Sequence, residues 1–292
     1  MKRYTLGINI PAQFHGAQVT AQIKEIARVG FDGFFTPWEP GYTGQWATAA
    51  AQSGLLYQSI HAPFLEAGRL WQPGEEGERL TEELIDCLRD CAHHSIPVMV
   101  AHAFIDFVDC PAPAQIGFDR HERVLEEAER LGVTLALENL VRTDALAALM
   151  QKFGHLPYCG FCYDSGHEHC FDPGHDLLAL YGDKLCHTHL NDNFGIIDPS
   201  LPPDRMPDHD LHLVMGDGSV DFGNVMARLN KTPYEGLLCC EIKQKNVAGR
   251  HDHDAYLHMP IEEFYALVLE RARAVRDGHL SQKQQNSKFF ID

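Results

Sequence analysis

Basic side chains are scarce in this sequence of 292 residues, which has 24 lysines and arginines against 41 aspartates and glutamates. The formal net charge is −17 when histidine is counted as neutral. Such a charge repels nucleic-acid phosphates and anionic membrane surfaces unless basic residues gather locally. The only lysine-rich piece is short, with Lys243 and Lys245 followed by Arg250. We therefore expect neither a nucleic acid nor a membrane as a partner.

Long hydrophobic runs are missing as well. No apolar stretch approaches the roughly 18 residues that a membrane-spanning helix needs. The first residues, MKRYTLGINIPAQF, contain only a short apolar run and do not resemble a secretory signal. The nine cysteines are odd in number and lie in apolar or helix-like contexts, which is typical of reduced thiols. These features predict a cytoplasmic protein.

Three well-known catalytic or nucleotide-binding motifs are also absent. No G-x-G-x-x-G joins an expected strand to a helix, and the sequence has no Walker-type lysine loop and no G-x-S-x-G. The GDG at residues 216–218 follows a loop and is only a weak phosphate-binding signal. Ser165 lacks the flanking glycines of a serine nucleophile. Dinucleotide binding, P-loop phosphoryl transfer and serine hydrolysis are therefore disfavoured.

What the sequence does contain is a series of short apolar runs that each end in a residue of metal-ligand type. These residues are His61, His102, Glu138, Asp164, His189 and Glu241. Each run has the length and the β-branched or aromatic content of a buried strand, and helix-like segments lie between the runs. Strict alternation of strands and helices predicts a parallel sheet, and a count of eight favours a closed (β/α)8 TIM barrel.

The expected barrel is a single α/β domain. The predicted strands are residues 4–10, 33–37, 55–61, 97–103, 134–138, 158–164, 185–190 and 236–242. Predicted helices include residues 17–29, 78–94, 113–131, 175–181, 222–229 and 261–277, and a long loop covers residues 193–220. The length suits one barrel of about 250 residues with longer loops. We expect the barrel to occupy residues 1–277 and residues 278–292 to be a polar C-terminal tail.

In a barrel of this kind the carboxyl ends of all strands meet at one mouth, so the six residues should share a pocket. Glu138, Asp164, His189 and Glu241 form the central set of predicted metal ligands. This oxygen-rich set suits a divalent cation such as Mn²⁺, Zn²⁺, Co²⁺ or Mg²⁺. For each residue alone, the alternative to a metal-ligand role is that polar residues are common at strand ends. For the set as a whole, however, a buried cluster of carboxylates without a cation would be costly.

Further polar and aromatic residues are expected around this set. His61 and His102 could bind a second metal that shares Glu138, or donate hydrogen bonds to a substrate hydroxyl. His167, Asp210 and His212 could hold another metal, with substrate binding by His167 and a self-stabilised polar loop as alternatives. Other residues are expected to line or cover the pocket, with core packing or a solvated loop as alternatives: these are Trp38, Phe64, Trp71 and residues 251–254.

Several short motifs occur in the order found in one protein superfamily. They are HAPF at 61–64, LEN at 137–139, YDSGH at 163–167, HLND at 189–192, D-x-H-L at 210–213, GDGxVDF at 216–222 and the glutamate at 241. In this order they resemble the xylose isomerase-like TIM-barrel proteins, which include sugar phosphate isomerases/epimerases and the endonuclease IV branch. The resemblance covers nearly all of residues 4–277.

What the resemblance implies depends on the branch. In the ketose epimerases the positions matching Glu138, Asp164, His189 and Glu241 bind one divalent metal, the two glutamates move the proton, and the match to His167 holds a substrate oxygen. An arginine expected shortly after the strand-seven histidine is replaced here by Asn-Phe-Gly at 193–195. In the endonuclease IV branch three zinc ions are bound. Their ligands match His61, His102, Glu138, Asp164, His167, His189, Asp210, His212 and Glu241, all present here.

The first hypothesis is a metal-dependent sugar or sugar-phosphate isomerase/epimerase that transfers a proton next to a carbonyl. Glu138 and Glu241 would be the acid/base pair, and His61, His167 and Trp38 would contact a small sugar or polyol substrate. The acidic pocket favours a neutral sugar or cyclitol, and a dehydratase would need the same groups. The alternatives are a multinuclear zinc phosphoesterase and a non-catalytic sugar-binding barrel. The sequence leaves open whether the chain forms a homo-oligomer.

Overall fold

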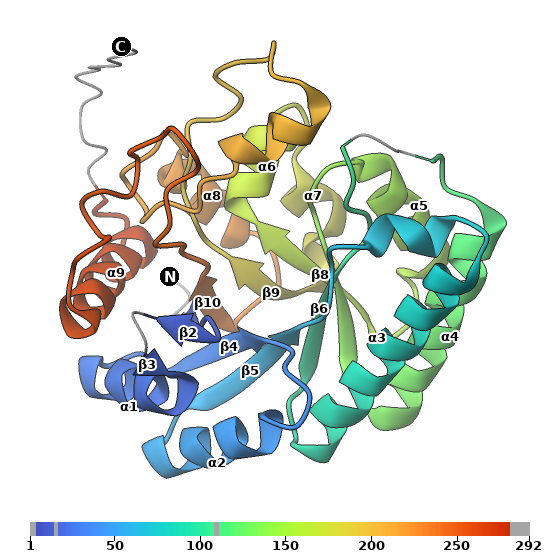
Figure 1. Ribbon diagram of the computed structural model, residues 1–292, viewed down its shortest axis with the longest axis horizontal. Helices are drawn as coiled ribbons and strands as arrows, with labels where there is room; N and C mark the ends of the chain where they lie inside the picture. Colours follow the sequence, from blue (N-terminus) through green and yellow to red (C-terminus); the bar gives the residue numbers. More distant parts are fainter. Residues whose placement is uncertain (1–3, 15–16, 108–110, 281–292) are drawn as a thin grey trace.

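The computed structural model describes residues 4–14, 17–107 and 111–280, and its chain forms a (β/α)8 barrel (Figure 1). Eight parallel strands lie in the order β10-β1-β4-β5-β6-β7-β8-β9, and a parallel bridge between Leu190 and Cys240 joins the two ends of the sheet. The strands are β1 (Thr5–Asn9), β4 (Gly33–Pro37), β5 (Leu56–His61), β6 (Val98–His102), β7 (Thr134–Glu138), β8 (Cys159–Asp164), β9 (Leu185–His189) and β10 (Leu237–Cys240). The predicted fold class is therefore confirmed.

Helices between the strands surround the barrel in Figure 1. They are α1 (Val19–Val29), α2 (Thr43–Ser53), α3 (Glu75–His93), α4 (Gln115–Leu131), α5 (Thr143–Phe153), α6 (Ser165–Phe171), α7 (Leu177–Tyr181), α8 (Phe222–Leu229) and α9 (Ile261–Arg276). Gly30, Gly54 and Gly132 end α1, α2 and α4 with φ of 108°, 68° and 70°. Glycine adopts this left-handed conformation without the cost that a Cβ atom imposes. Within the described residues, no helix has both the length and the hydropathy that a membrane span requires.

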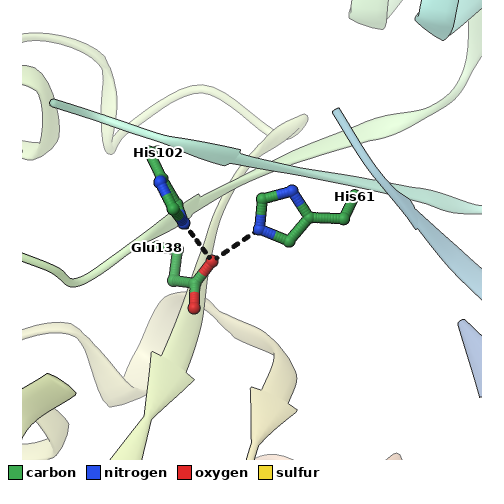
Figure 2. Close-up of side chains that lie close together, drawn as sticks. All are labelled: His61, His102 and Glu138. Carbon is green, nitrogen blue, oxygen red and sulfur yellow. Dashed lines mark hydrogen bonds and ion pairs between the residues drawn. The ribbon is translucent and has the colours of Figure 1, made fainter. Parts of the chain in front are cut away.

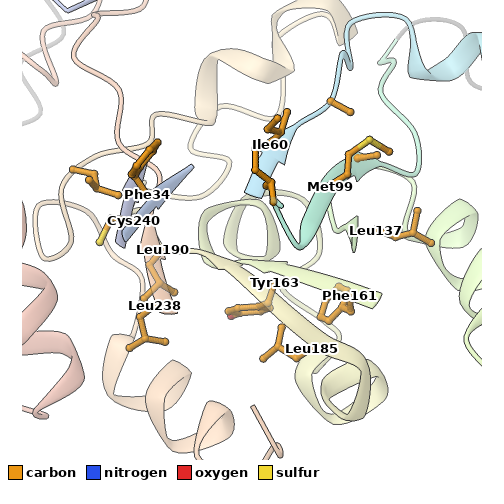
Figure 3. Close-up of a cluster of buried hydrophobic side chains, with 14 of the residues drawn as sticks. Phe34, Ile60, Met99, Leu137, Phe161, Tyr163, Leu185, Leu190, Leu238 and Cys240 are labelled. Atoms are coloured by element: carbon orange, nitrogen blue, oxygen red, sulfur yellow. The ribbon is translucent and has the colours of Figure 1, made fainter. Parts of the chain in front are cut away.

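Alternation of side chains along the strands separates two buried layers. Outward-facing residues such as Ile60, Met99 and Leu137 pack in the main apolar core (Figure 3). A separate small cluster groups Val100 of β6 with Cys162 of β8, together with Val98, Ala136 and Cys186. Because side chains two residues apart on a strand share a face, the residues two positions after Val100, Ala136 and Cys162 also point inward. The barrel mouth is therefore lined by the last residues of β6, β7 and β8.

The structure differs from the predicted elements in several short segments. Residues Gln13–Phe14 and Ala17–Gln18 pair as the antiparallel strands β2 and β3, so the first helix begins at Val19 and not at 17. The sequence does not predict helix α6, and 3-10 turns occupy Ala67–Trp71 and Pro203–His209 within predicted loops. The last strand ends at Cys240, one residue before Glu241. Most of the predicted tail, residues 281–292, lies outside the described residues.

The GDG sequence at residues 216–218 has a structural role, which argues against phosphate binding by its backbone amides. The Asp192 carboxylate accepts hydrogen bonds from the backbone N–H groups of Gly216, Gly218 and Val220 at 2.8, 2.9 and 2.9 Å. A Cβ atom on Gly218 would lie 2.4 Å from Asp192 Oδ1, so this position needs glycine. The amides that could bind a phosphate are thus used to fold the loop that follows β9.

His121 on α4 is a buried titratable group that lies away from the barrel mouth. Its Nδ1 donates a hydrogen bond to the Gly117 carbonyl at 2.7 Å, and its ring centroid lies 5.3 Å from that of Trp71. Burial lowers the pKa of His121 from 6.5 to about 4. The unfolded chain therefore takes up this proton at a higher pH than the folded chain does.

Replacing His121 with leucine should make folding stability less dependent on pH. As the pH falls from 6.5 to 4, wild-type protein should lose up to about 3 kcal/mol of unfolding free energy through this one group. His121→Leu should remove that part of the slope in urea denaturation at about pH 7, 5.5 and 4.5. The matched control is His251→Leu, because the His251 side chain is 82% exposed. Equal slopes for wild type and His121→Leu would contradict the assignment.

Candidate metal centre and active site

Glu138, at the carboxyl end of β7, lies at the centre of the polar groups in the barrel mouth. Its Oε2 lies 3.1 Å from His61 Nε2 and 3.1 Å from His102 Nε2 (Figure 2). Its Oε1 lies 2.8 Å from His189 Nδ1. The Glu138 side chain is fully buried. One carboxylate from β7 is thus contacted by imidazoles from β5, β6 and β9.

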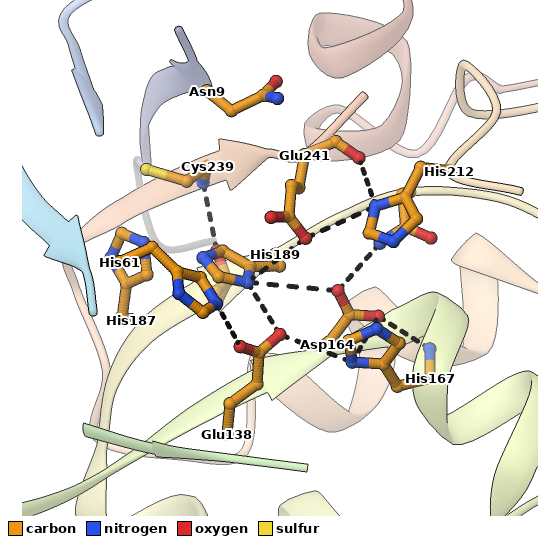
Figure 4. A network of polar contacts seen from close by, with 12 residues as sticks. Asn9, His61, Glu138, Asp164, His167, His187, His189, His212, Cys239 and Glu241 are labelled. Atoms are coloured by element: carbon orange, nitrogen blue, oxygen red, sulfur yellow. Dashed lines mark hydrogen bonds and ion pairs between the residues drawn. The ribbon is translucent and has the colours of Figure 1, made fainter. Parts of the chain in front are cut away.

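The four predicted central ligands converge on one point. Single ligand atoms of Glu138, Asp164, His189 and Glu241 all lie within 4.8 Å of one another. His189 Nδ1 is 3.4 Å from Glu241 Oε2 and 4.0 Å from Asp164 Oδ2 (Figure 4). Three carboxylates in a largely buried site repel one another and lose their hydration, so the arrangement is costly without a compensating cation.

Two neighbouring groups complete the set suggested by the sequence. His61 and His102 form one group with Glu138, and His167, Asp210 and His212 form another. In the second group, Asp210 Oδ2 lies 2.7 Å from His212 Nε2 and 3.4 Å from His167 Nε2. His167 Nδ1 is also 3.4 Å from Glu138 Oε1, which links this group to the centre. All nine predicted ligand positions therefore lie in one connected cluster.

Backbone carbonyl groups fix the orientation of three of these imidazoles. His61 Nδ1 lies 2.9 Å from the Ala62 carbonyl oxygen, His167 Nδ1 2.8 Å from that of Asn139, and His212 Nδ1 3.0 Å from that of Glu241. A carbonyl oxygen can only accept, so each Nδ1 carries the proton. In the neutral ring, Nε2 then presents a lone pair towards the neighbouring carboxylate. Either a second proton or a cation must lie between the two acceptors, as at a metal centre.

The pKa values of several residues in the cluster are shifted from their usual values, as expected at a site where a cation can replace bound protons. Burial raises the pKa of Asp164 to about 6 and lowers that of His102 to about 4. Burial also opposes ionisation of Glu138, but His189 and His102 outweigh it and hold the Glu138 pKa well below its usual range. Burial opposes protonation of His189 as well, yet Glu138 and Glu241 raise its pKa to about 9. Without a cation, Glu138 and Glu241 therefore keep His189 protonated at neutral pH, whereas His102 is neutral.

Asp164 is held in place by groups whose roles the sequence did not reveal. Its Oδ2 accepts a hydrogen bond from Asn191 Nδ2 at 2.8 Å, and its Oδ1 accepts one from the His167 backbone N–H at 2.7 Å. The second bond makes Asp164 the N-cap of α6. Asn139 exchanges two hydrogen bonds with the Asp164 backbone, at 2.8 and 2.9 Å. Asn139 and Asn191 belong to the LEN and HLND motifs, so the motifs marked them without showing their function.

Cys162 is a further potential ligand that sequence reasoning missed. It pairs in register with Glu138, and its sulfur falls within 4.8 Å of ligand atoms of Glu138 and His189. Burial raises the pKa of its thiol well above the usual value. Because Cys162 lies inside an apolar strand, only the strand register could have indicated its position beneath the centre.

The predicted aromatic wall is correct only in part. The Phe64 ring lies 5.0 Å from that of His61 and 4.9 Å from that of His102, so it borders the site. Trp71 does not, because it is buried in the core with its Nε1 donating to the Ala103 carbonyl at 2.9 Å. Its expected place at the pocket was wrong, and the core-packing alternative holds. Trp38 lies beside the site, but its Nε1 donates to Asp90 at 3.0 Å.

The loop after β10 contacts the segment that carries Asp210 and His212. Its His253 is buried and lies with Nε2 2.9 Å from the Leu211 carbonyl oxygen, between Asp210 and His212. This contact supports the segment that carries both predicted ligands. His212 itself has a φ of 50°, a conformation that costs energy for a residue with a side chain. The loop conformation thus presents the imidazole to the centre at the expense of local backbone strain.

A cavity of about 340 Å³ opens above the cluster and is bordered by His61, Phe64, His102, His167, Asp210, His212, Glu241 and Lys243, together with apolar residues. Lys243 is the only lysine or arginine among the described residues that line it. Its Nζ lies 3.5 Å from Asp210 Oδ2. The cavity therefore offers a small hydroxylated molecule many acceptors and one cationic side chain.

The sequence profile of a known family covers most of this barrel. The profile described as xylose isomerase-like TIM barrel matches residues 23–259. This chain belongs to that family. The resemblance carried by the motifs is thereby confirmed, and with it the fold class on which the site was built.

Similar proteins extend this finding. The uncharacterized protein y4fM of Sinorhizobium fredii is 32% identical over 151 residues, which are 48% of this chain and 44% of that protein. The chain thus spans less than half the length of this relative. A D-psicose 3-epimerase with D-tagatose from Clostridium cellulolyticum H10 has a TM-score of 0.72 at 15% identity, over 94% of this chain and 99% of that one. An L-ribulose 3-epimerase has a TM-score of 0.70 at 15% identity, covering 99% and 100%. At this identity the two structures share the fold.

Removing the Asp164 carboxylate should release most of the bound metal. Asp164→Ala takes one oxygen ligand from the centre and leaves Asn191 without its acceptor, so the loss should be at least about tenfold in affinity. Protein purified in the presence of Mn²⁺ or Zn²⁺ should show the loss by elemental analysis. Asp144→Ala is the matched control, because Asp144 is exposed on α5 and pairs with Arg142 at 2.7 Å. Equal metal content in both variants would remove Asp164 from the ligand set.

Proposed function

We propose that this protein is a metal-dependent isomerase or epimerase that acts on a sugar or polyol by proton transfer next to a carbonyl. The observation that carries the proposal is the convergence of Glu138, Asp164, His189 and Glu241 within 4.8 Å at the barrel mouth. Sugar 3-epimerases with the same fold support it. Mn²⁺, Zn²⁺, Co²⁺ and Mg²⁺ all suit this mixture of oxygen and nitrogen ligands.

A divalent cation held by these four residues would act as a Lewis acid and stabilise negative charge on substrate oxygens. Glu138 and Glu241 supply the proton transfer. Burial opposes their ionisation, but the neighbouring imidazoles lower the pKa of both groups, so both can accept a proton at neutral pH. The Glu241 side chain is 17% exposed and borders the cavity, whereas that of Glu138 is fully buried. We therefore assign the first proton abstraction to Glu241.

His61 and His167 orient the substrate. Their Nδ1 atoms are bonded to backbone carbonyls, which fixes each ring with its Nε2 near a carboxylate of the site, and both residues line the cavity where a substrate hydroxyl would bind. Trp38 cannot offer its N–H, because Asp90 accepts it at 3.0 Å, and it contributes an apolar surface instead. Two carboxylates, Asp210 and Glu241, line the cavity against one cationic side chain, Lys243, which disfavours a phosphorylated substrate. A free ketose, polyol or cyclitol ketone fits this environment best.

The proton-transfer role is tested by isotope exchange. With Mn²⁺ in D₂O, the protein should exchange a carbon-bound proton of a ketose or an inosose-type ketone, followed by NMR. Glu241→Gln keeps the shape and one ligand oxygen but removes the base, so turnover should fall by roughly 10²-fold or more. Metal content should fall less than in Asp164→Ala.

Glu263→Gln provides the matched control for this test, because Glu263 lies in the exposed first turn of α9. It should exchange at the wild-type rate. The substrate panel should pair each free ketose with its phosphate ester, since the acidic cavity predicts preference for the free sugar. Absence of exchange on every compound by metal-loaded wild type would refute the isomerase proposal.

A multinuclear zinc phosphoesterase is the second candidate function. It is favoured by one specific observation: two further ligand groups adjoin the central one. His61 and His102 share Glu138 with it, and His167 is 3.4 Å from that same carboxylate while contacting Asp210. Several cations in line could stabilise the attacking and leaving oxygens of a phosphate ester. The net charge of −17 argues against a nucleic-acid substrate for such an enzyme.

Metal stoichiometry separates the two functions. The isomerase proposal predicts about one tightly held divalent ion per chain, which His212→Ala should leave in place, because His212 is outside the central set. Elemental analysis after dialysis against metal-free buffer would measure it. About three zinc ions per chain, one of them lost in His212→Ala, together with phosphate release from phosphate esters, would favour the phosphoesterase instead.

A further inference from the structure

A second cavity, of about 590 Å³, adjoins the metal centre on the side of β4, β5 and α3. We call this second cavity the apolar groove. Its walls include Trp38, Phe64, Leu65 and Leu80. His61, Phe64 and Leu65 line both the apolar groove and the cavity above the cluster, so the two spaces adjoin at these three side chains. A substituent on a molecule bound at the candidate metal centre would have to pass only these side chains to reach the groove.

The indole that forms one wall of the groove is fixed in position. Trp38 Nε1 donates to Asp90 Oδ2 at 3.0 Å, and the Thr43 hydroxyl donates to that same oxygen. The anchor Asp90 belongs to α3, and Trp38 lines the groove. At the rim, Leu65 is 82% exposed, which is unusual for a leucine beside a polar site. A preformed apolar wall with an exposed rim is typical of a ligand site.

The charges around the groove select against an anionic ligand. Of its lining residues, all within the described chain, none is a lysine or arginine, and the carboxylates are Glu66 and Glu83. Both pair with Arg79, at 2.8 Å in the case of Glu83, so their charges are compensated at the outer end. A phosphate or carboxylate would find no cationic partner among these lining residues, whereas an alkyl or aryl group would be removed from water.

We propose that the apolar groove binds an apolar substituent of the substrate. The substrate is then amphipathic, with a hydroxylated or keto end at the metal centre and an alkyl or aryl group between Trp38 and Leu65. Because His61, Phe64 and Leu65 line both spaces, we assign the groove to the ligand of the centre and not to a separate partner. This inference rests on the proposed function in one respect only, that the centre binds a small molecule through a divalent ion.

Metal-chelating probes with growing tails test the groove directly. Isothermal titration calorimetry would compare acetohydroxamate, butanohydroxamate and hexanohydroxamate on protein loaded with Zn²⁺ or Mn²⁺. The hydroxamate head anchors every probe at the metal, so differences in affinity report the tail. Affinity should rise by about fourfold for each methylene that is fully buried in the groove. Equal affinities along the series, or no binding of any member, would overturn the proposal.

Variants locate the effect. Trp38→Ala and Leu65→Ser should flatten the dependence on tail length, whereas Leu65→Met should preserve it. Leu65→Ser should leave acetohydroxamate affinity within about twofold. Leu180→Ser is the matched control, because Leu180 is 61% exposed on α7, outside the groove. A length dependence that persists in Trp38→Ala and Leu65→Ser would place the tail elsewhere and refute the proposal.

A second copy of the chain is the competing occupant of the groove. It would be revealed by a dimer in analytical ultracentrifugation that Leu65→Ser dissociates, together with a flat hydroxamate series, and this result would overturn the proposal. The readout is also independent of turnover. If proton exchange in D₂O fails while affinity still grows with tail length, the isomerase function is wrong and the apolar subsite stands. The reverse result leaves the function and removes the subsite.

Discussion

The Glu138 carboxylate is the group around which the rest of the site is arranged. It is fully buried, and imidazoles from three other strands reach it at 2.8 to 3.1 Å. Removing a carboxylate from water costs several kcal/mol unless positive charge compensates it. In the barrel this cost is offset because strands β5, β6 and β9 hold the compensating imidazoles at fixed positions. A rigid closed sheet is therefore a condition for the site, since a shift of one strand would separate the charges.

Hydrogen bonds to the backbone determine what these groups can do. In His61, His167 and His212, one ring nitrogen is bonded to a carbonyl oxygen, so the other faces the carboxylates as an acceptor. In the folded chain, imidazole Nε2 atoms thus face carboxylate oxygens. Both are hydrogen-bond acceptors, so a proton or a cation must lie between them. At His167 a proton occupies this position. Burial opposes protonation of His167, but Asp164 and Asp210 raise its pKa above the usual value. Metal binding and proton release should consequently be coupled in this protein.

Sequence reasoning succeeded where periodicity and strand ends carried the information. Each predicted strand ending in His61, Glu138 or Asp164 was placed correctly, because apolar strand content and a terminal polar residue are both local signals. It failed where the decisive contact is distant. Helix α6 has seven residues, and its polar and apolar residues show no clear periodicity. Its start depends on N-capping by Asp164. The sequence marks Asp164 as a ligand-type residue at a strand end and does not indicate this capping role. Trp71 and Cys162 likewise required strand register and packing to be placed.

The same cluster would suit either of the two proposed chemistries, because its ligand groups share residues. Glu138 belongs both to the central set and to the group with His61 and His102, so a cation in one place alters the charge available to the other. What separates the two functions is the surroundings. A phosphate ester would need cationic or amide donors beyond the metals, yet Lys243 is the only such cation among the described residues around the cavity, and Asp210 already lies 3.5 Å from it. The Gly216 and Gly218 amides are bonded to Asp192. An uncharged hydroxylated substrate needs none of these donors, which is why the surroundings favour proton transfer over phosphate ester hydrolysis.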